Sequence, residues 1–233
     1  MTSGLRYAVI TPARNEADNL PRLAESLRSQ SVPPLVWLIV DNGSTDATAD
    51  IAVRHPLGPK IIRQANMGVA AAINRGVGES KGDCLAILDS DDLWDANWLA
   101  EATKALAERN VDAVFGRMIT FLDPSLSPKD AARLHYQARA DRGLLFGACV
   151  LRREAFATLG GLNADLRTGC FIDFYHRFLV AGMKSDHLSH VGLHRRIRED
   201  SFSRRAKESL AQDFLQIARA AIARKRSLNG TYK

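Results

Sequence analysis

Three carboxylic acids stand within four residues in the segment Asp89-Ser90-Asp91-Asp92, directly after an apolar run. Like charges held this close repel one another unless a cation or hydrogen-bond donors neutralise them. Carboxylate oxygens suit Mg²⁺ and Mn²⁺, which proteins commonly hold through one or two carboxylates together with substrate phosphates. The cluster therefore predicts a divalent-metal site. The alternative is an acidic turn in which Asp92 caps the helix that follows.

Polar residues also follow three earlier apolar runs. The polar segments are TPARNE at 11–16, DNGS at 41–44 and QANMG at 64–68. Because ligands of open parallel sheets bind at the carboxyl ends of strands, we expect these segments and the acidic cluster to converge on one sheet edge. Asp41 is placed there to accept a hydrogen bond from a ring N–H such as that of uracil, or to form an Asx turn with Ser44. Gly68 either lets the backbone approach a ligand or begins a helix.

The elements that must position these segments alternate along the chain. Apolar runs typical of buried strands are separated by stretches in which apolar residues recur at helical spacing. The expected strands are 5–11, 35–41, 60–64, 84–89, 111–121 and 144–151. The expected helices are 20–27, 46–55, 68–80, 97–110, 153–159, 171–181 and 207–226. Such alternation predicts an α/β fold with a mostly parallel central sheet flanked by helices.

Composition excludes several classes of protein. The 233 residues are 46% hydrophobic and 25% charged, which is the balance of an ordinary globular chain. No apolar run reaches the roughly 18 residues of a transmembrane helix, and the first residues lack a secretory signal pattern, so we expect a cytoplasmic protein. The three cysteines are dispersed without a CxxC pair, which argues against a zinc ribbon or a disulfide framework.

The net charge of +6 is concentrated near the C-terminus. Between Arg195 and Arg226 the sequence holds ten Lys/Arg and four Asp/Glu, so the rest of the chain is neutral. The last expected helix carries an apolar stripe, formed by Leu210, Phe214, Ile217 and Ala221. We expect this stripe to dock on the domain, with peripheral contact at the inner face of a membrane as the alternative. Nucleic acid is not an expected partner, because no stacking aromatic residues are interleaved with the basic ones.

The segments PARNEADNL, LIVDNGSTDAT and NMGVAAAINRGVGESKGDCLAILDSDD resemble, in order and spacing, family 2 glycosyltransferases of the GT-A fold. The resemblance covers residues 5–95 and continues more weakly to about 205. It implies transfer of a sugar, with inversion, from a nucleotide-diphospho-sugar donor, here expected to be UDP-linked, with Mn²⁺ or Mg²⁺ as cofactor. It leaves the acceptor open among saccharides, lipid-linked acceptors, peptides and small molecules. The expected organisation is a single domain over 1–233, with a nucleotide-binding half (1–95), an acceptor-side half (96–205) and a C-terminal helical tail (206–233).

The resemblance also implies roles for individual residues. Around the nucleoside it places Pro12, Ala13, Arg14 and Glu16, with Asp41 on the base. The other nucleotide-binding residues expected are Asn66, Gly68, Asp89 and Ser90. Asp89 and Asp91 form the D-x-D element that holds the metal, with Asp91 favoured as the direct ligand.

The chain departs from the family where the catalytic base is expected. Relatives often carry an acidic pair at the start of a helix, and Cys170 and Phe171 stand in those positions here. Asp173 is the nearest carboxylate and our candidate base, with Asp165 a weaker one. Helical geometry turns Asp173 about 200° away from Phe171, however, and an ion pair with Arg177 at i+4 is the alternative. The lost pair motivates a second hypothesis, a non-catalytic protein that binds a nucleotide or a partner through the same fold.

A second departure is Arg198, which stands where many relatives carry a histidine that can reach the metal or the diphosphate. A guanidinium group cannot ligate a metal, but it can donate two hydrogen bonds to phosphate oxygens. We therefore expect Arg198 to contact the diphosphate of the donor. The alternative is that the arginines at 195–198 only flank the acidic residues Glu199 and Asp200.

Overall fold

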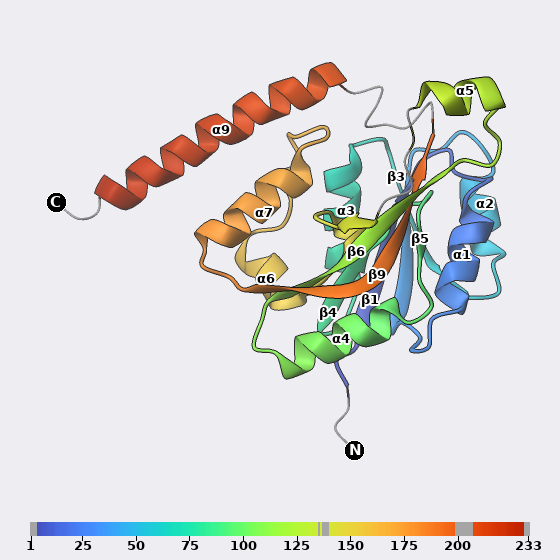
Figure 1. The fold of residues 1–233 in the computed structure, drawn as a ribbon, viewed down its shortest axis with the longest axis horizontal. Helices are drawn as coiled ribbons and strands as arrows, with labels where there is room; N and C mark the ends of the chain where they lie inside the picture. The colour runs from blue at the N-terminus through green and yellow to red at the C-terminus, as the bar shows by residue number, and fades with distance from the viewer. Residues whose placement is uncertain (1–3, 135, 137–139, 199–206, 231–233) are drawn as a thin grey trace.

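The structure is a computed structural model that describes residues 4–134, 136, 140–198 and 207–230. Its strands form one sheet in the order β3-β2-β1-β4-β8-β6-β9-β5, and β7 pairs with β6 beside this path. Helices cover both faces of the sheet, and the last helix lies at one end of the molecule (Figure 1). The expected α/β fold is confirmed.

The first half of the sheet is wholly parallel. It consists of β1 (Tyr7–Ala13), β2 (Val36–Asn42), β3 (Lys60–Gln64) and β4 (Cys84–Ile87). The connecting helices are α1 (Leu20–Arg28), α2 (Thr48–Val53) and α3 (Val69–Glu79). All of these elements were expected, with bounds within a few residues. Because the four strands run in the same direction, their carboxyl ends share one edge of the sheet.

The second half is mixed rather than mostly parallel. The strand β8 (Cys149–Arg152) runs antiparallel to β4 and to β6 (Ala113–Leu122), whereas β9 (Ser185–Ile197) runs parallel to β6. The remaining strands are β5 (Leu93–Trp94) and β7 (Ala140–Arg142). The helices of this half are α4 (Trp98–Glu108), α5 (Pro128–Arg133), η1 (Phe146–Ala148), α6 (Arg153–Thr158) and α7 (Cys170–Val180). The strands β5, β7 and β9 and the helix α5 were not predicted from the sequence.

Two apolar clusters hold the layers together, one on each face of the sheet. Val9 of β1 belongs to the cluster under α1 and α4, whereas Ala8 and Ile10 belong to the cluster under α3 and α7. This alternation is the two-residue period of a strand buried on both faces. Gly76 lets α3 approach the sheet, because a Cβ atom there would lie 2.6 Å from a methyl carbon of Ile10.

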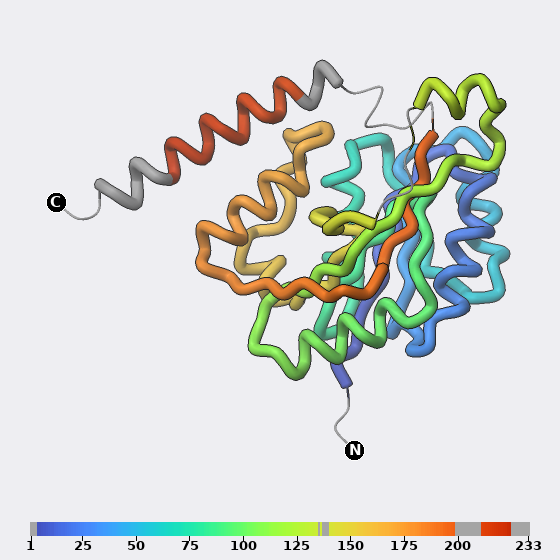
Figure 2. Tube along the Cα trace, viewed as in Figure 1, coloured from blue at the N-terminus to red at the C-terminus, as the bar shows by residue number. Residues whose placement is uncertain are grey.

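The C-terminal helix α9 (Lys207–Gly230) docks on α7 through one of its faces (Figures 1 and 2). Asp213 is buried and accepts hydrogen bonds from the backbone N–H groups of Thr168 and Gly169, at 2.6 and 2.8 Å. Ile217 is also buried. The helix thus docks on the domain as expected, but not through the whole expected apolar stripe, since Phe214 is 48% exposed. The described helices include none that is both long and apolar enough to span a bilayer.

Candidate active site

The polar segments after β1 and β2 meet at the carboxyl edge of the sheet. Ala13 pairs with Asp41 in the register of these two strands. Beyond them, the backbone N–H of Asn15 donates to the Ser44 hydroxyl at 3.0 Å, and that of Glu16 donates to the Thr48 hydroxyl at 2.8 Å. These bonds hold the segment after β1 against the segment after β2. Pro12 and Ala13 are buried beside Asp41, whereas Arg14 is exposed.

Asn42, which the sequence analysis did not assign, joins the second segment to the third. Its Oδ1 accepts hydrogen bonds from Gln64 Nε2 at 2.9 Å and from the backbone N–H of Met67 at 3.0 Å, and its Nδ2 donates to Asn66. Gly68 begins α3 with a φ of +87°. The alternative that Gly68 begins a helix is confirmed. No atom lies within 4 Å of a Cβ placed there, so the approach of a ligand to this backbone stays a prediction.

Asp41 is buried at the end of β2, and its Oδ1 accepts a hydrogen bond from the Ser44 backbone N–H at 3.0 Å. This bond reaches three residues along the chain, whereas an Asx turn spans two, so Asp41 holds the turn after β2 in a related way. Contact between Asp41 and a nucleobase stays a prediction, with the second carboxylate oxygen, Oδ2, as its expected acceptor.

Arg198 links the acidic cluster to the segment after β1. Its Nη2 lies 2.9 Å from Asp91 Oδ2 and 3.0 Å from Glu16 Oε1. The Asp91 and Arg198 side chains are 18% exposed and that of Glu16 is 11% exposed. Burial raises the pKa of Glu16, while Asn19 and Arg198 act against that rise. Residues 182 positions apart thus form one ion-pair network at the sheet edge.

Arg196, near the end of β9, binds the other side of the same acidic cluster. Asp92 is buried and accepts a hydrogen bond from the Arg196 backbone N–H at 2.8 Å. Burial raises the pKa of Asp92, and the charges of Asp91 and Asp89 raise it further. The Arg196 side chain donates to the Asp91 carbonyl at 3.0 Å. The alternative that Asp92 caps a helix is wrong, because Asp92 binds β9 instead.

Asp89 is exposed, and Ser90 beside it is buried. Desolvation and then the charge of Asp91 raise the pKa of Asp89, whereas Arg195 lowers it. Within the described residues no group of three His, Cys, Asp or Glu side chains is arranged to hold a metal. The available donors are the carboxylates of Asp89 and Asp91. This set fits Mg²⁺ or Mn²⁺ only if phosphates and water complete the coordination shell.

The start of α7 lies near Asp89 but carries no carboxylate in its first two positions. Cys170 is buried, and burial followed by the charge of Asp89 raises the pKa of its thiol to about 12. The Phe171 ring lies 4.8 Å from the Phe146 ring and 5.8 Å from the Tyr175 ring, measured between centroids. Apolar packing therefore occupies the positions where relatives place an acidic pair.

Asp173 is only 2% exposed, and arginines engage both of its oxygens. Arg177 Nε lies 2.8 Å from Oδ2, which confirms the i+4 pair, and Arg224 Nη2 of α9 lies 3.1 Å from Oδ1. Both oxygens of Asp173 are thus engaged by guanidinium groups and not open to an acceptor hydroxyl, so these contacts disfavour Asp173 as the general base. Asp165 is exposed.

We expect the variant Asp173→Asn to lose stability rather than chemistry. Removing one partner from a buried ion pair costs about 3 kcal/mol, which lowers the melting temperature of a chain of this size by about 6 °C or more. Release of nucleoside diphosphate from a sugar donor, measured below the melting temperature, is expected to change little. A base, in contrast, contributes about 10²–10⁴-fold to rate, so a loss of that size without destabilisation would restore Asp173 to that role. The control Asp50→Asn, at an exposed carboxylate paired with Arg63, is expected to change neither quantity.

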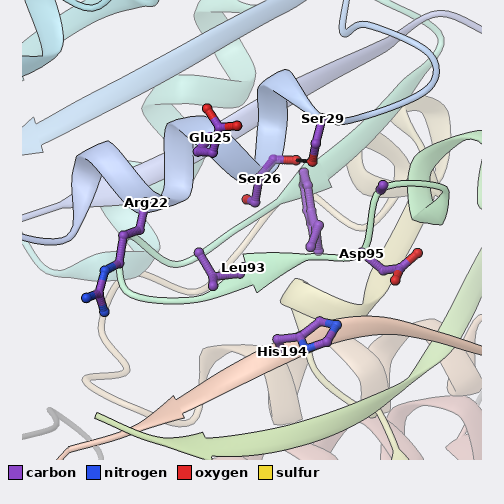
Figure 3. A pocket seen from close by; sticks show the side chains of 9 residues that line it. Arg22, Glu25, Ser26, Ser29, Leu93, Asp95 and His194 are labelled. Atoms are coloured by element: carbon purple, nitrogen blue, oxygen red, sulfur yellow. Dashed lines mark hydrogen bonds between the residues drawn. The ribbon is translucent and has the colours of Figure 1, made fainter. Parts of the chain in front are cut away.

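A groove of about 450 Å³ lies next to the acidic cluster, between α1 and β5 (Figure 3). Arg22 and Ser26 of α1 line one side of it, and Leu93 and His194 line the other. None of the site residues expected from the sequence lines this groove. It therefore lies outside the ion-pair network at the sheet edge.

Comparison with known sequences agrees with this geometry. Residues 8–159 match the family described as Glycosyl transferase family 2. The chain belongs to this family. It is 33% identical over 176 residues to a PGL/p-HBAD biosynthesis glycosyltransferase of Mycobacterium bovis. The aligned region covers 72% of this chain and 67% of that protein. The chain is also 34% identical over 125 residues to the glycosyltransferase AglE of Haloferax volcanii. That aligned region covers 51% of this chain and 41% of that protein.

Solved structures of the same architecture support the fold of this family 2 chain. The Staphylococcus aureus TarS 1–349 structure in complex with UDP superposes with a TM-score of 0.71 at 19% identity, over 93% of this chain and 64% of that one. The mannosyltransferase PcManGT of Pyrobaculum calidifontis, in complex with GDP-Man and Mn²⁺, gives a TM-score of 0.71 at 23% identity, over 95% and 65% of the two chains. The chain thus spans less than two thirds of either solved protein.

Proposed function

We propose that this family 2 protein transfers a sugar from a UDP-linked donor to an acceptor hydroxyl, with inversion. The observation that carries the proposal is the contact of Arg198 with both Asp91 and Glu16, at 2.9 and 3.0 Å. It brings the strand ends of β1, β4 and β9 to one charged site beside Asp41. Proteins of the same fold have been solved with UDP, UDP-GlcNAc and GDP-Man, and one of them also with Mn²⁺.

Different residues of the chain would contact the nucleobase and the diphosphate of the donor. Asp41 Oδ2 would accept a hydrogen bond from the N–H of uracil. The nucleoside and sugar-phosphate would lie against the remaining edge residues, which are Pro12, Ala13, Arg14, Glu16, Asn66, Gly68, Asp89 and Ser90. Asn42 would hold Asn66 in place, because it donates to that side chain.

Charge develops on the leaving nucleoside diphosphate as the glycosidic bond breaks. Arg198 would stabilise this charge by forking onto the phosphate oxygens. A divalent metal held by Asp91 and Asp89 would, when bound, neutralise the same diphosphate. We further propose that transfer takes place at a membrane surface contacted through α9.

The buried Cys170 and the packed Phe171 favour a second candidate function, nucleotide binding without transfer. Inversion in one displacement needs a base on the acceptor side, and these two side chains provide none. Release of UDP from a panel of UDP-sugars separates the candidates. Turnover above the uncatalysed rate supports the enzyme, whereas tight binding without turnover supports the binding protein.

We expect UDP with Mn²⁺ to raise the melting temperature of the protein. A ligand at 100 times its dissociation constant stabilises the native state by about 2.7 kcal/mol, which corresponds to about 5 °C or more in a chain of this size. The measurement is a thermal-shift panel of UDP, GDP and CDP, each with and without Mn²⁺. A larger shift with GDP than with UDP would refute the uracil contact of Asp41. No shift with any nucleotide would refute both candidate functions.

A further inference from the structure

Half of the exposed large apolar side chains of the described residues belong to two helices that are in contact. Twelve large apolar side chains of the described residues are exposed, and six of them lie on α7 and α9. We name these six the α7/α9 face: Ile172, Leu179 and Val180 of α7, with Phe214, Leu215 and Ile222 of α9. Single exposed apolar residues are ordinary on any protein, whereas a gathering of them marks an interaction surface.

The two helices are fixed to each other, so the face does not depend on a loose tail. Asp213 accepts hydrogen bonds from the backbone before α7, and Arg224 pairs with Asp173 inside α7. These contacts use one side of α9. At 100° per residue, Phe214, Leu215 and Ile222 fall within about 100° of one another on a different side. Figures 1 and 2 show α9 beside α7, at the end of the molecule away from α1 and α2.

The apolar part of α9 adjoins positive charge. Arg219 is exposed between Leu215 and Ile222 along the helix, and the sequence adds Lys225 and Arg226 in the next turn. Of the two acids in the helix, Asp213 is buried against the start of α7. A second copy of the chain, packed through the same face, would bring these cations together. An anionic lipid surface instead accepts both the apolar side chains and the basic ones.

We propose that the α7/α9 face binds the surface of a bilayer that contains anionic phospholipid, with α9 lying in the plane of the headgroups. The apolar side chains enter the boundary between headgroups and acyl chains, and the basic residues meet the phosphates. Binding in this way needs no donor and no acceptor. If the proposed transfer function also holds, it places the start of α7, next to Asp89, close to the lipid and favours a lipid-linked acceptor.

The test is cosedimentation of the full chain with vesicles of phosphatidylcholine, alone or mixed with phosphatidylglycerol. We expect binding to the mixed vesicles that weakens as salt is added. The triple variant Phe214→Ser, Leu215→Ser, Ile222→Ser is expected to bind at least about tenfold more weakly, because three apolar side chains no longer enter the acyl boundary. The matched control is Val32→Ser, Val53→Ser, Leu57→Ser, which removes three exposed apolar side chains elsewhere and is expected to bind like the wild type.

Several outcomes would overturn the proposal. These are no binding to the mixed vesicles at low salt, equal binding to phosphatidylcholine alone, or equal loss in the two triple variants. A concentration-dependent dimer in light scattering that only the α9 variant abolishes would assign the face to a second copy. The melting temperature of the α9 variant without ligand verifies that it is folded. Its UDP thermal shift, measured in parallel, separates failure of the lipid proposal from failure of the proposed function.

Discussion

Replacing Asp91 by asparagine is expected to reduce release of UDP from the sugar donor by about 10³-fold and to abolish the effect of Mn²⁺ on UDP binding. Asparagine keeps the size of the side chain but removes the charge that a metal or Arg198 requires. A bound metal ion supplies several kcal/mol of charge stabilisation, and each 1.36 kcal/mol corresponds to tenfold in rate. The measurements are donor turnover and calorimetric titration of UDP with and without Mn²⁺.

The stability of the Asp91→Asn variant is expected to change little. The Asp91–Arg198 pair is partly exposed, at 18% for each side chain, and pairs in contact with water contribute about 1 kcal/mol or less. The control is Asp50→Asn, which removes an exposed carboxylate paired with Arg63 at 3.4 Å and should leave turnover and metal dependence unchanged. Unaltered Mn²⁺-dependent UDP affinity in Asp91→Asn would refute the metal assignment.

The parallel half of the fold was predictable because its strands are buried on both faces. Val9 and Ile10 of β1 face opposite apolar clusters, so the sequence there is a continuous apolar run and stands out from its surroundings. The strand β9 was missed because its sequence, SDHLSHVGLHRRI, is mostly polar and partly exposed. Its pairing with β6 and β5 over long sequence distances holds it as a strand, and no local pattern reports such pairing.

This omission explains what was missed in the site. Arg198 was expected to contact the diphosphate and Arg196 had no assigned role, whereas the structure brings Arg196 to Asp92 and to the Asp91 carbonyl. Side chains two positions apart on a strand share a face, so an extended reading of this segment would have indicated that both arginines approach the acidic cluster. Which carboxylate each arginine binds depends on the register of β9 against the rest of the sheet, which the sequence does not specify.

The acidic cluster was expected to be neutralised by a divalent cation or by hydrogen-bond donors, and the structure supplies donors and charges from the chain itself. Without a ligand, Arg198 pairs with Asp91, and the Arg196 backbone N–H donates to Asp92. Arg195 lowers the pKa of Asp89. Positive groups of the chain itself thus offset part of the repulsion. An acidic cluster is therefore evidence for a cation, and the surrounding residues decide whether that cation is a metal or an arginine.

Arg198 and a metal ion would compete for Asp91. In the variant Arg198→Ala we therefore expect metal-supported UDP binding to improve and turnover to fall. Mn²⁺ is expected to support UDP binding at a several-fold lower concentration, because the guanidinium group no longer occupies Asp91 Oδ2. Turnover of the sugar donor is expected to fall by about 10²-fold, because the leaving diphosphate loses a charged donor. Manganese titrations of UDP binding, followed by calorimetry, measure the first part, and UDP release measures the second.

Arg198→Lys separates charge from geometry, because lysine keeps the charge but cannot fork onto phosphate oxygens. We expect its metal requirement to resemble the wild type and its turnover to lie between the wild type and Arg198→Ala. Arg54→Ala, at an exposed position, is the control and should match the wild type in both. If the wild type binds UDP equally well without metal and Arg198→Ala loses that binding, Arg198 itself is the cation of this site and the metal role of Asp91 is wrong. Either result identifies which positive charge faces the diphosphate.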